Sequence, residues 1–134
     1  MPRFRPRLTA LAVTGAALAV AVPALAAGGT TTSEKLVNFK IVGPSKVKAG
    51  AVTFKVANSA TIGHEMVVIR TATKASKIPL ENGRASEAGS VGEVEFKAGK
   101  AGTLRLTLKP GHYVLLCNVG SHYKLGMYKD LTVT

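Results

Sequence analysis

Cysteine is nearly absent from this sequence and tryptophan is missing altogether, since the 134 residues include 1 Cys and no Trp. A single cysteine excludes a disulfide framework within one chain, a four-cysteine zinc site and a CxxC redox pair. Cys117 is therefore an unpaired thiol, which is either a small buried hydrophobe or a reactive group. Cys117 is therefore the first candidate for a functional residue.

Acidic and aromatic residues are also scarce. Seven Asp and Glu stand against 18 Lys and Arg, and Phe, Trp and Tyr together make up 5% of the chain. The seven acids are scattered along the sequence, so no carboxylate pair suggests a hydrolase. The lysines are spread rather than clustered and few aromatics lie between them, which argues against a nucleic-acid-binding surface.

Length and composition predict one globular domain. The chain is close to the usual length of a single domain, about 150 residues. Its hydrophobic fraction of 46% is too high for a disordered protein. The sequence contains no heptad or collagen-type repeat, so a fibrous protein is excluded as well.

The first 26 residues have the pattern of an export signal. Three arginines precede an uncharged apolar run over 8–22, and Ala24 and Ala26 form an A-x-A cleavage site. We predict a Sec-type bacterial signal peptide over 1–26, and a protein that works in the periplasm or outside the cell. The alternative is an uncleaved anchor, because the uncharged segment is long enough to cross a bilayer. Its alanine-rich, leucine-poor composition favours cleavage.

Removal of the signal leaves a basic domain. Residues 27–134 keep 15 of the 18 Lys and Arg and all 7 acids, which gives a net charge of +8. This charge is either an ordinary solvated surface or a means of steering the protein toward an acidic partner or an anionic membrane surface.

The remaining chain has the pattern of short β-strands separated by turns. Residues 27–35 predict a flexible lead-in, because the run GGTTTS is rich in glycine and small polar residues. From 36 to 134, apolar side chains recur at every second position between Gly, Pro and Asn turn signals. The predicted strands cover residues 35–42, 51–57, 64–70, 93–96, 103–108, 113–117 and 131–133. Strands of this length and spacing predict an all-β sandwich or barrel.

Two stretches of the sequence carry more specific expectations. Val37, Phe39 and Ile41 alternate with polar residues, so one continuous strand is expected over 35–42. The stretch from 71 to 89 lacks this alternation, and we predict a helical turn or a long flap loop there, as the most mobile part of the domain.

The end of the sequence concentrates metal-binding side chains in one loop. Cys117 ends an apolar strand, His122 lies in the loop after it, and Met127 opens the next segment, in the spacing C-x4-H-x4-M. Far upstream, His64 begins another strand. Thiolate and thioether are soft ligands and imidazole suits copper, so two histidines, a cysteine and a long axial methionine make a blue-copper electron-transfer site. Zinc also takes cysteine and histidine, but it rarely takes methionine.

These residues make the sequence similar to the small blue-copper proteins of the cupredoxin family, the plastocyanin and azurin group. The similarity covers about 36–133 and rests on Gly63-His64, on the run KPGHYVLLC over 109–117 and on the loop to Met127. It implies a Greek-key β-sandwich with copper at one end. It also implies a tyrosine, Tyr113, that braces the corner leading into the cysteine strand.

The resemblance implies one type 1 copper ion and assigns its ligands. His64, Cys117 and His122 would be equatorial, and Met127 would be the weak axial ligand. The edge of His122 would reach solvent within a ring of apolar residues and serve as the exit for the electron. The candidates for this ring are Val119, Leu125 and Tyr123.

The resemblance also implies roles for residues beside the ligands. Gly63 would place its carbonyl on the second axial side, and the amides of Glu65 and Val119 would point at the Cys117 sulfur. Many members have Asn or Ser at the position of Glu65, so we expect Asn118 and Glu65 to exchange roles and hydrogen-bond across the two ligand loops. Many also have Pro-Gly before the loop histidine, where this chain has Gly-Ser, which predicts a less rigid loop.

Each candidate ligand also has an ordinary structural interpretation. Met127 could be core filler, and His64 becomes a candidate only through the C-x4-H-x4-M triplet. Met66 lies two residues beyond His64 and is expected to pack in the core. His112 follows a Pro-Gly turn and is expected to be solvated.

We therefore predict an exported protein that shuttles single electrons between redox partners through Cu(I) and Cu(II), and that is not an enzyme. Its partner would be a protein such as a cytochrome or an oxidase, with an acidic surface. We expect a monomer that binds no nucleic acid and touches a membrane only through an uncleaved signal or its surface charge. The alternative is a periplasmic copper-binding or copper-handling protein without an electron-transfer role.

Overall fold

A computed structural model describes residues 28–134, so the predicted signal peptide lies outside the described residues. The regular secondary structure of the described part of the chain consists of β-strands and two short 3-10 helices. The elements are β1 (Thr30–Val37), β2 (Lys40–Val42), β3 (Lys46–Val47), β4 (Gly50–Asn58), β5 (His64–Arg70), η1 (Ala75–Lys77), β6 (Leu80–Glu81), β7 (Arg84–Ala85), β8 (Ser90–Phe96), β9 (Ala101–Leu108), β10 (Gly111–Leu116), η2 (Tyr123–Leu125) and β11 (Tyr128–Val133). No helix in this region is both long and apolar enough to cross a membrane.

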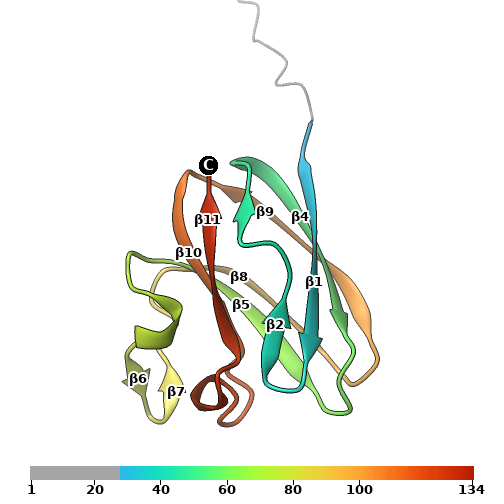
Figure 1. The fold of residues 1–134 in the computed structure, drawn as a ribbon, viewed down its shortest axis with the longest axis vertical. Helices are drawn as coiled ribbons and strands as arrows, with labels where there is room; N and C mark the ends of the chain where they lie inside the picture. Colours follow the sequence, from blue (N-terminus) through green and yellow to red (C-terminus); the bar gives the residue numbers. More distant parts are fainter. Residues whose placement is uncertain (1–27) are drawn as a thin grey trace, which may run out of the picture.

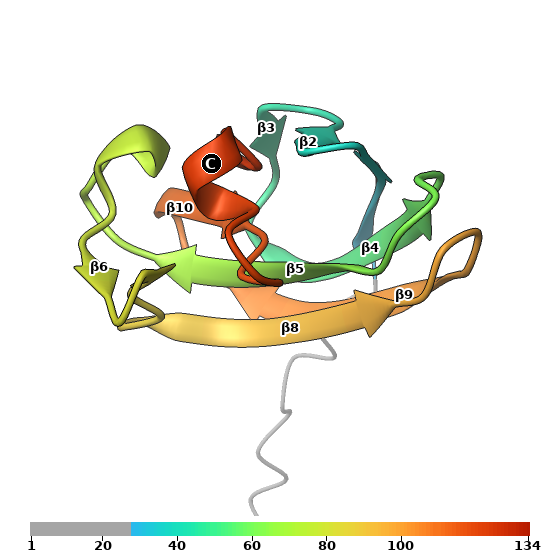
Figure 2. The ribbon, with the colours of Figure 1, turned by 90° about the horizontal axis from the view of Figure 1, so that it is seen from below.

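The strands form two sheets that pack face to face, as predicted (Figure 1). The first sheet has the order β2-β1-β4-β9, and the second has the order β3-β11-β10-β5-β8. Strands β1 and β4 run parallel, as do β3 and β11, while the other pairs within the two sheets are antiparallel. Strands β6 and β7 form a separate small hairpin. Figure 2 views the molecule from the lower end of Figure 1.

The main core lies between the two sheets and follows from the period-two pattern of the strands. In β1 and β4 every second side chain is buried, which brings Leu36, Phe54 and Val56 inward. Met66 is fully buried in this core, as predicted. The Tyr113 hydroxyl donates a hydrogen bond to the Lys109 carbonyl at 3.0 Å, so the corner leading into β10 is braced in the expected way.

Within the described residues, the prediction for the segment 28–42 is wrong in two respects. The supposed lead-in is ordered as a strand from Thr30 onward, because β1 pairs in parallel with β4 from Thr30 opposite Val52. The expected continuous strand over 35–42 is instead a hairpin, since β1 ends at Val37 and turns back through Phe39 into β2. Phe39 therefore lies in a turn at one end of the sandwich and not on the core face of a strand.

The stretch from 71 to 89 forms the expected flap and contains the expected helical turn, η1. It covers the outer face of the second sheet, so β5 and β10 are buried on both faces. Ala75, Ile78 and Ala85 from the flap pack with Val67 and other sheet residues in a second apolar cluster. This packing argues against the mobility that the sequence suggested, because side chains buried in a second core hold the flap to the sheet.

Tyr123 fastens the flap to the loop that follows β10. Its hydroxyl accepts a hydrogen bond from the Ile78 amide at 3.0 Å and donates one to the Ala75 carbonyl at 2.7 Å. In a Tyr123→Phe variant both backbone groups lose this partner inside the protein, at a cost of about 1–3 kcal/mol. We expect faster amide hydrogen exchange at Ile78 than in a Tyr128→Phe control, whose ring lies 5.0 Å from Tyr123 between centroids. Equal exchange in the two variants would contradict this role for Tyr123.

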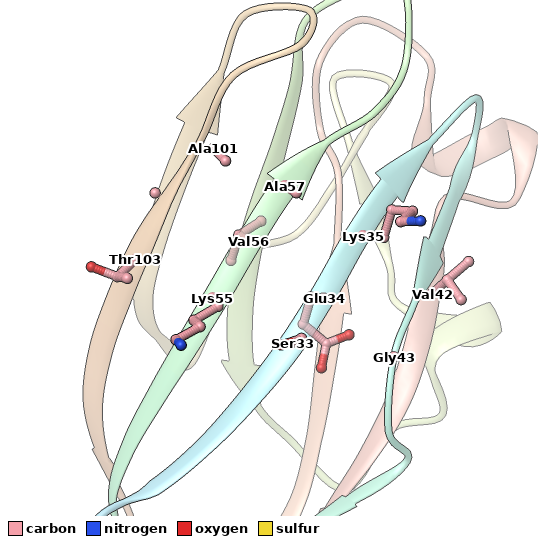
Figure 3. Close-up of a pocket in the computed structure, with 11 residues that line it drawn as sticks. Ser33, Glu34, Lys35, Val42, Gly43, Lys55, Val56, Ala57, Ala101 and Thr103 are labelled. Atoms are coloured by element: carbon pink, nitrogen blue, oxygen red, sulfur yellow. The ribbon is translucent and has the colours of Figure 1, made fainter.

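The outward face of the first sheet bears small and basic side chains. An open groove crosses β1, β4 and β9 between the amino groups of Lys35 and Lys55 (Figure 3). Glu34 belongs to β1, but its side chain turns to the opposite face of the sheet. There its carboxylate is buried and lies 3.1 Å from the Lys129 amino group. This ion pair links β1 of the first sheet to β11 of the second.

Candidate metal centre

The predicted ligands come from loops at one end of the sandwich. His64 is the first residue of β5, Cys117 directly follows β10, and His122 and Met127 lie between β10 and β11. This end is the lower one in Figure 1, opposite the C-terminus. The antiparallel register of β5 and β10 places Leu116 opposite Val67, so the start of one strand lies beside the end of the other.

Three of the candidate ligand atoms converge on one point. The Cys117 sulfur lies 3.4 Å from Nδ1 of His122 and 3.9 Å from Nδ1 of His64, and the two Nδ1 atoms are 3.1 Å apart. For three atoms with these separations, the point equally distant from all of them lies about 2.0 Å from each. An ion at that point would be at bonding distance, because metal bonds to imidazole nitrogen and thiolate sulfur measure about 2.0–2.3 Å. The cluster therefore fits a single metal ion.

The protonation of these groups also suits a metal. Burial lowers the pKa of His64, and its proximity to His122 lowers it further. Burial also lowers the pKa of His122. Both effects favour neutral imidazole, the form that binds metals. Burial raises the pKa of the Cys117 thiol, so metal binding at this sulfur displaces a proton.

Met127 lies at the same place in the fold. Its side chain is fully buried, and its carbonyl accepts a hydrogen bond from the Cys117 amide at 3.0 Å. Its own amide donates to the His122 carbonyl at 3.1 Å. Two backbone hydrogen bonds thus hold Met127 next to both loop ligands, and the chain supplies the His-Cys-His-Met set that binds type 1 copper.

The solved structures that resemble this fold include copper proteins. No protein-family model matches the chain, and no curated protein sequence matches it significantly. Auracyanin A, a "blue" copper protein from Chloroflexus aurantiacus, matches with a TM-score of 0.60 and 20% identity over 80% of this chain and 100% of its own. The chain has the cupredoxin fold. Reduced auracyanin from Roseiflexus castenholzii matches with a TM-score of 0.57 and 19% identity, over 79% of this chain and 96% of its own. Rusticyanin from Thiobacillus ferrooxidans matches with a TM-score of 0.59 and 16% identity, over 79% of this chain and 77% of its own.

In this fold the thiol of Cys117 receives the backbone contacts that were expected. The Glu65 amide donates a hydrogen bond to the sulfur at 3.4 Å. Burial raises the pKa of the thiol, while the amides of Glu65 and Val119 lower it in part. Amide hydrogen bonds to sulfur reduce the electron donation of a thiolate to a metal, so they tune the site. The direction of the Gly63 carbonyl stays a prediction.

The two ligand loops are tied together by Glu65, and the tie is made differently from the expectation. The Glu65 carboxylate accepts a hydrogen bond from the main-chain amide of Asn118 at 2.7 Å. The Asn118 side chain turns to the flap instead, where it exchanges two hydrogen bonds with the backbone of Ala85 and donates a third to Glu87. Asn118 therefore links the loop between β10 and β11 to the flap, while Glu65 links the same loop to β5.

Phe39 is a site residue that the sequence did not reveal. Its ring meets the ring of His122 edge-on, with centroids 5.1 Å apart at an interplanar angle of 76°, and that of His64 at 6.4 Å and 86°. Phe39 has φ of +56°, a backbone conformation that costs a non-glycine residue about 1–2 kcal/mol. Alternation of apolar residues cannot signal a left-handed turn, so the pattern predicted a continuous strand through this position.

The predicted apolar ring around His122 is correct only in part. Leu125 is 57% exposed and Val119 is half-buried, so both are available at the surface beside the ligand. Tyr123 is only 7% exposed because its ring packs under the flap, and it does not belong to the ring. Phe39 takes its place.

Two further expectations about charged groups need correction. His112 is only partly solvated: its side chain is 31% exposed, and its ring nitrogens lie 2.6 Å from the Thr71 carbonyl oxygen and 2.8 Å from the Asp130 carboxylate. The acids are scattered only along the sequence. Folding brings four of them to one cleft beside the Asn118 side chain, namely Glu65, Glu81, Glu87 and Glu93.

Proposed function

We propose that this protein is a one-electron carrier whose type 1 copper ion cycles between Cu(I) and Cu(II). The observation that carries the proposal is the convergence of the Cys117 sulfur with the two Nδ1 atoms of His64 and His122, all within 3.9 Å of one another. Bound copper supplies a reversible one-electron couple. Not being an enzyme is part of the same proposal: the residues would hold the ion and do no bond-making chemistry.

The contribution of the chain is a site that changes little when an electron arrives or leaves. His64, Cys117 and Met127 are fully buried, and three of the four ligands are attached to strand ends of a packed core. Such a core resists adjustment, so it holds the ligands in one arrangement for both oxidation states. This rigidity supports an electron carrier over a copper-handling protein, which has to release its ion.

His122 provides the route to a partner, because it is the least buried of the four ligands. Exposed apolar side chains accompany it at this end: Phe39 touches its ring, Leu125 follows three residues later, and Ile62 precedes His64 by two. A small apolar patch around a ligand edge supports brief, weak docking of a redox partner.

The partner and the compartment are also part of the proposal. We infer that the protein works as a monomer in the periplasm or outside the cell, since its first 26 residues have the pattern of a bacterial signal peptide. Its partner is a redox protein such as a cytochrome or an oxidase. The charge of +8 on residues 27–134 supports a partner with an acidic docking surface.

The test is the colour and electron exchange of the copper-loaded protein. We expect an intense visible band, reversible one-electron titration, and rapid stopped-flow exchange with an acidic cytochrome that slows steeply as salt is raised. His122→Ala should lose the band, whereas the control His112→Ala should keep it. A colourless protein that binds Cu(I) tightly and exchanges no electrons would overturn the carrier function in favour of copper handling.

A further inference from the structure

One of the two histidine ligands, His64, lacks the usual outer support within the described residues. A metal-bound histidine normally donates its second ring N–H to a carboxylate, a carbonyl or water, which fixes the orientation of the ring. Nε2 of His64 is buried and has no hydrogen-bond partner among residues 28–134. The orientation of this imidazole must therefore depend on the packing around it.

The His122 loop lacks the stiffness that a proline directly before the histidine would give it. It contains Gly120, with φ of +52°, followed by Ser121, and no proline precedes the histidine. The backbone of His122 is held by its amide, which donates to Val119 O at 3.1 Å, and by its carbonyl. These bonds fix the main chain and leave the side-chain torsions free.

Phe39 supplies a contact that both rings share. It reaches them from the β1–β2 turn of the first sheet, whereas His64 begins β5 of the second sheet and His122 lies in the loop between β10 and β11. Its ring stands nearly perpendicular to each imidazole, at 5.1 Å from His122 and 6.4 Å from His64. Perpendicular packing of this kind favours one orientation of each ring.

The backbone at position 39 indicates that this side chain is retained for its ring. Two non-glycine residues of the described chain have a left-handed φ, and the other is Asn82, in the Asn-Gly turn between β6 and β7. Asparagine tolerates this conformation and a bulky aromatic residue does not. A residue that is unfavourable for its turn and touches two ligands is typical of a functional site.

We propose that Phe39 is a positioning residue that holds the imidazoles of His64 and His122 in their ligand orientations and thereby sets how long a copper ion stays bound. The proposal rests on the copper site described above. Loss of the ring leaves the fold and the four donor side chains in place but frees the rotation of the two imidazoles. Copper then leaves faster, because each ligand can turn away from the ion independently.

The experiment compares Phe39→Asn, which suits the turn, with Phe39→Tyr, which keeps the ring, and with Val42→Ala. Val42 is a matched control because it is 48% exposed and lies on the same hairpin, in β2. A Cu(I) chelator in excess should remove copper from Phe39→Asn about tenfold faster than from wild type. A factor of about ten in rate corresponds to the free energy of one strong aromatic contact. Phe39→Tyr and Val42→Ala should release copper at the wild-type rate.

A second readout separates positioning from stability. Phe39→Asn should unfold at the same temperature as wild type or higher, because asparagine relieves the backbone strain. In the Cu(I) proteins, the imidazole NMR signals of His64 and His122 should broaden or shift in this variant, while those of His112 stay unchanged. If Phe39→Asn does not fold, the comparison of Phe39→Leu with Phe39→Tyr decides, since only the former should release copper faster.

The proposal is overturned if the asparagine or leucine variant releases copper at the wild-type rate with unchanged imidazole signals. It is also overturned if all variants, including Val42→Ala, release copper equally fast. Failure of the copper site itself would be recognised separately, because wild-type protein would then bind no copper and show no visible band.

Discussion

Copper-loaded Cys117→Ser protein is expected to be colourless. The intense visible band of a type 1 site arises from charge transfer from thiolate to copper, and serine offers a hard, protonated oxygen in its place. The sulfur is central to the cluster, since it lies 3.4 Å from one ligand nitrogen and 3.9 Å from the other. We therefore expect complete loss of the band and at least a tenfold weaker copper affinity, because changing even a residue beside the ligands typically costs about 10–100-fold.

The fold of this variant should survive. Serine is smaller than cysteine, and the buried hydroxyl costs about 1–3 kcal/mol, less than the stability of a typical domain. Circular dichroism of the metal-free protein measures this directly. Met66→Leu is the matched control, because it changes another fully buried, sulfur-containing side chain of the same core and should leave the protein blue. A serine variant that retains the band would show that Cys117 does not bind the metal.

The ligands could be predicted from the sequence because three of them are local. The spacing C-x4-H-x4-M places Cys117, His122 and Met127 on one loop between two strands, whatever the rest of the fold does. Their convergence with His64 could not be derived from spacing, because it depends on which strands are neighbours. That step came from the resemblance to cupredoxins, and the pairing of β5 with β10 agrees with it.

The elements that were missed depend on the conformation of single residues or on irregular packing. The hairpin at Phe39 requires a left-handed φ at an aromatic residue, which no propensity would favour. The flap holds its apolar residues at irregular intervals, at Ala75, Ile78 and Ala85, so no helix or strand period marks the face that packs. In contrast, the uninterrupted apolar run of β5 is the usual sign of a strand buried on both faces.

The Glu34–Lys129 pair is the third feature that sequence alone did not show. Glu34 lies in a stretch rich in threonine and serine, which resembled a flexible lead-in. In the fold its side chain is completely buried, and a Cβ at Gly43 would overlap its carboxylate, so the chain packs tightly around it. Lys129 also donates a hydrogen bond to the Pro44 carbonyl, which fixes the connection after β2.

Lys129→Met is expected to destabilise the domain by about 3–5 kcal/mol at neutral pH, the usual cost of leaving one member of a buried ion pair without its partner. Methionine keeps the apolar length of the lysine side chain, so the loss reports the missing charge. The measurement is urea unfolding of the metal-free protein, compared with Lys46→Met, which removes an exposed lysine from β3. A loss of less than 1 kcal/mol would show that the pair does not hold the two sheets together.

The pH dependence of this loss identifies its cause. Burial raises the pKa of Glu34, and the nearby charge of Lys129 opposes the rise. Without Lys129 the pKa of Glu34 in the folded protein lies higher still. The folded protein therefore keeps a proton on Glu34 at a pH at which the unfolded chain has released it. Stability of the variant therefore falls as pH rises through that folded pKa and is recovered as pH falls below it. The difference from wild type should be largest at pH 7.5 and shrink at pH 5; a difference that stays constant with pH would contradict a charge effect.

The double variant Glu34→Gln/Lys129→Met separates the ion pair from the shape of the core. When both charges are removed, no ion remains buried, and uncharged replacements of buried pairs are often neutral or stabilising. We expect the double variant to be more stable than Lys129→Met at pH 7.5 and to show little change down to pH 5. If the double variant is as unstable as Lys129→Met at both pH values, the packing of Lys129 matters, and its charge does not.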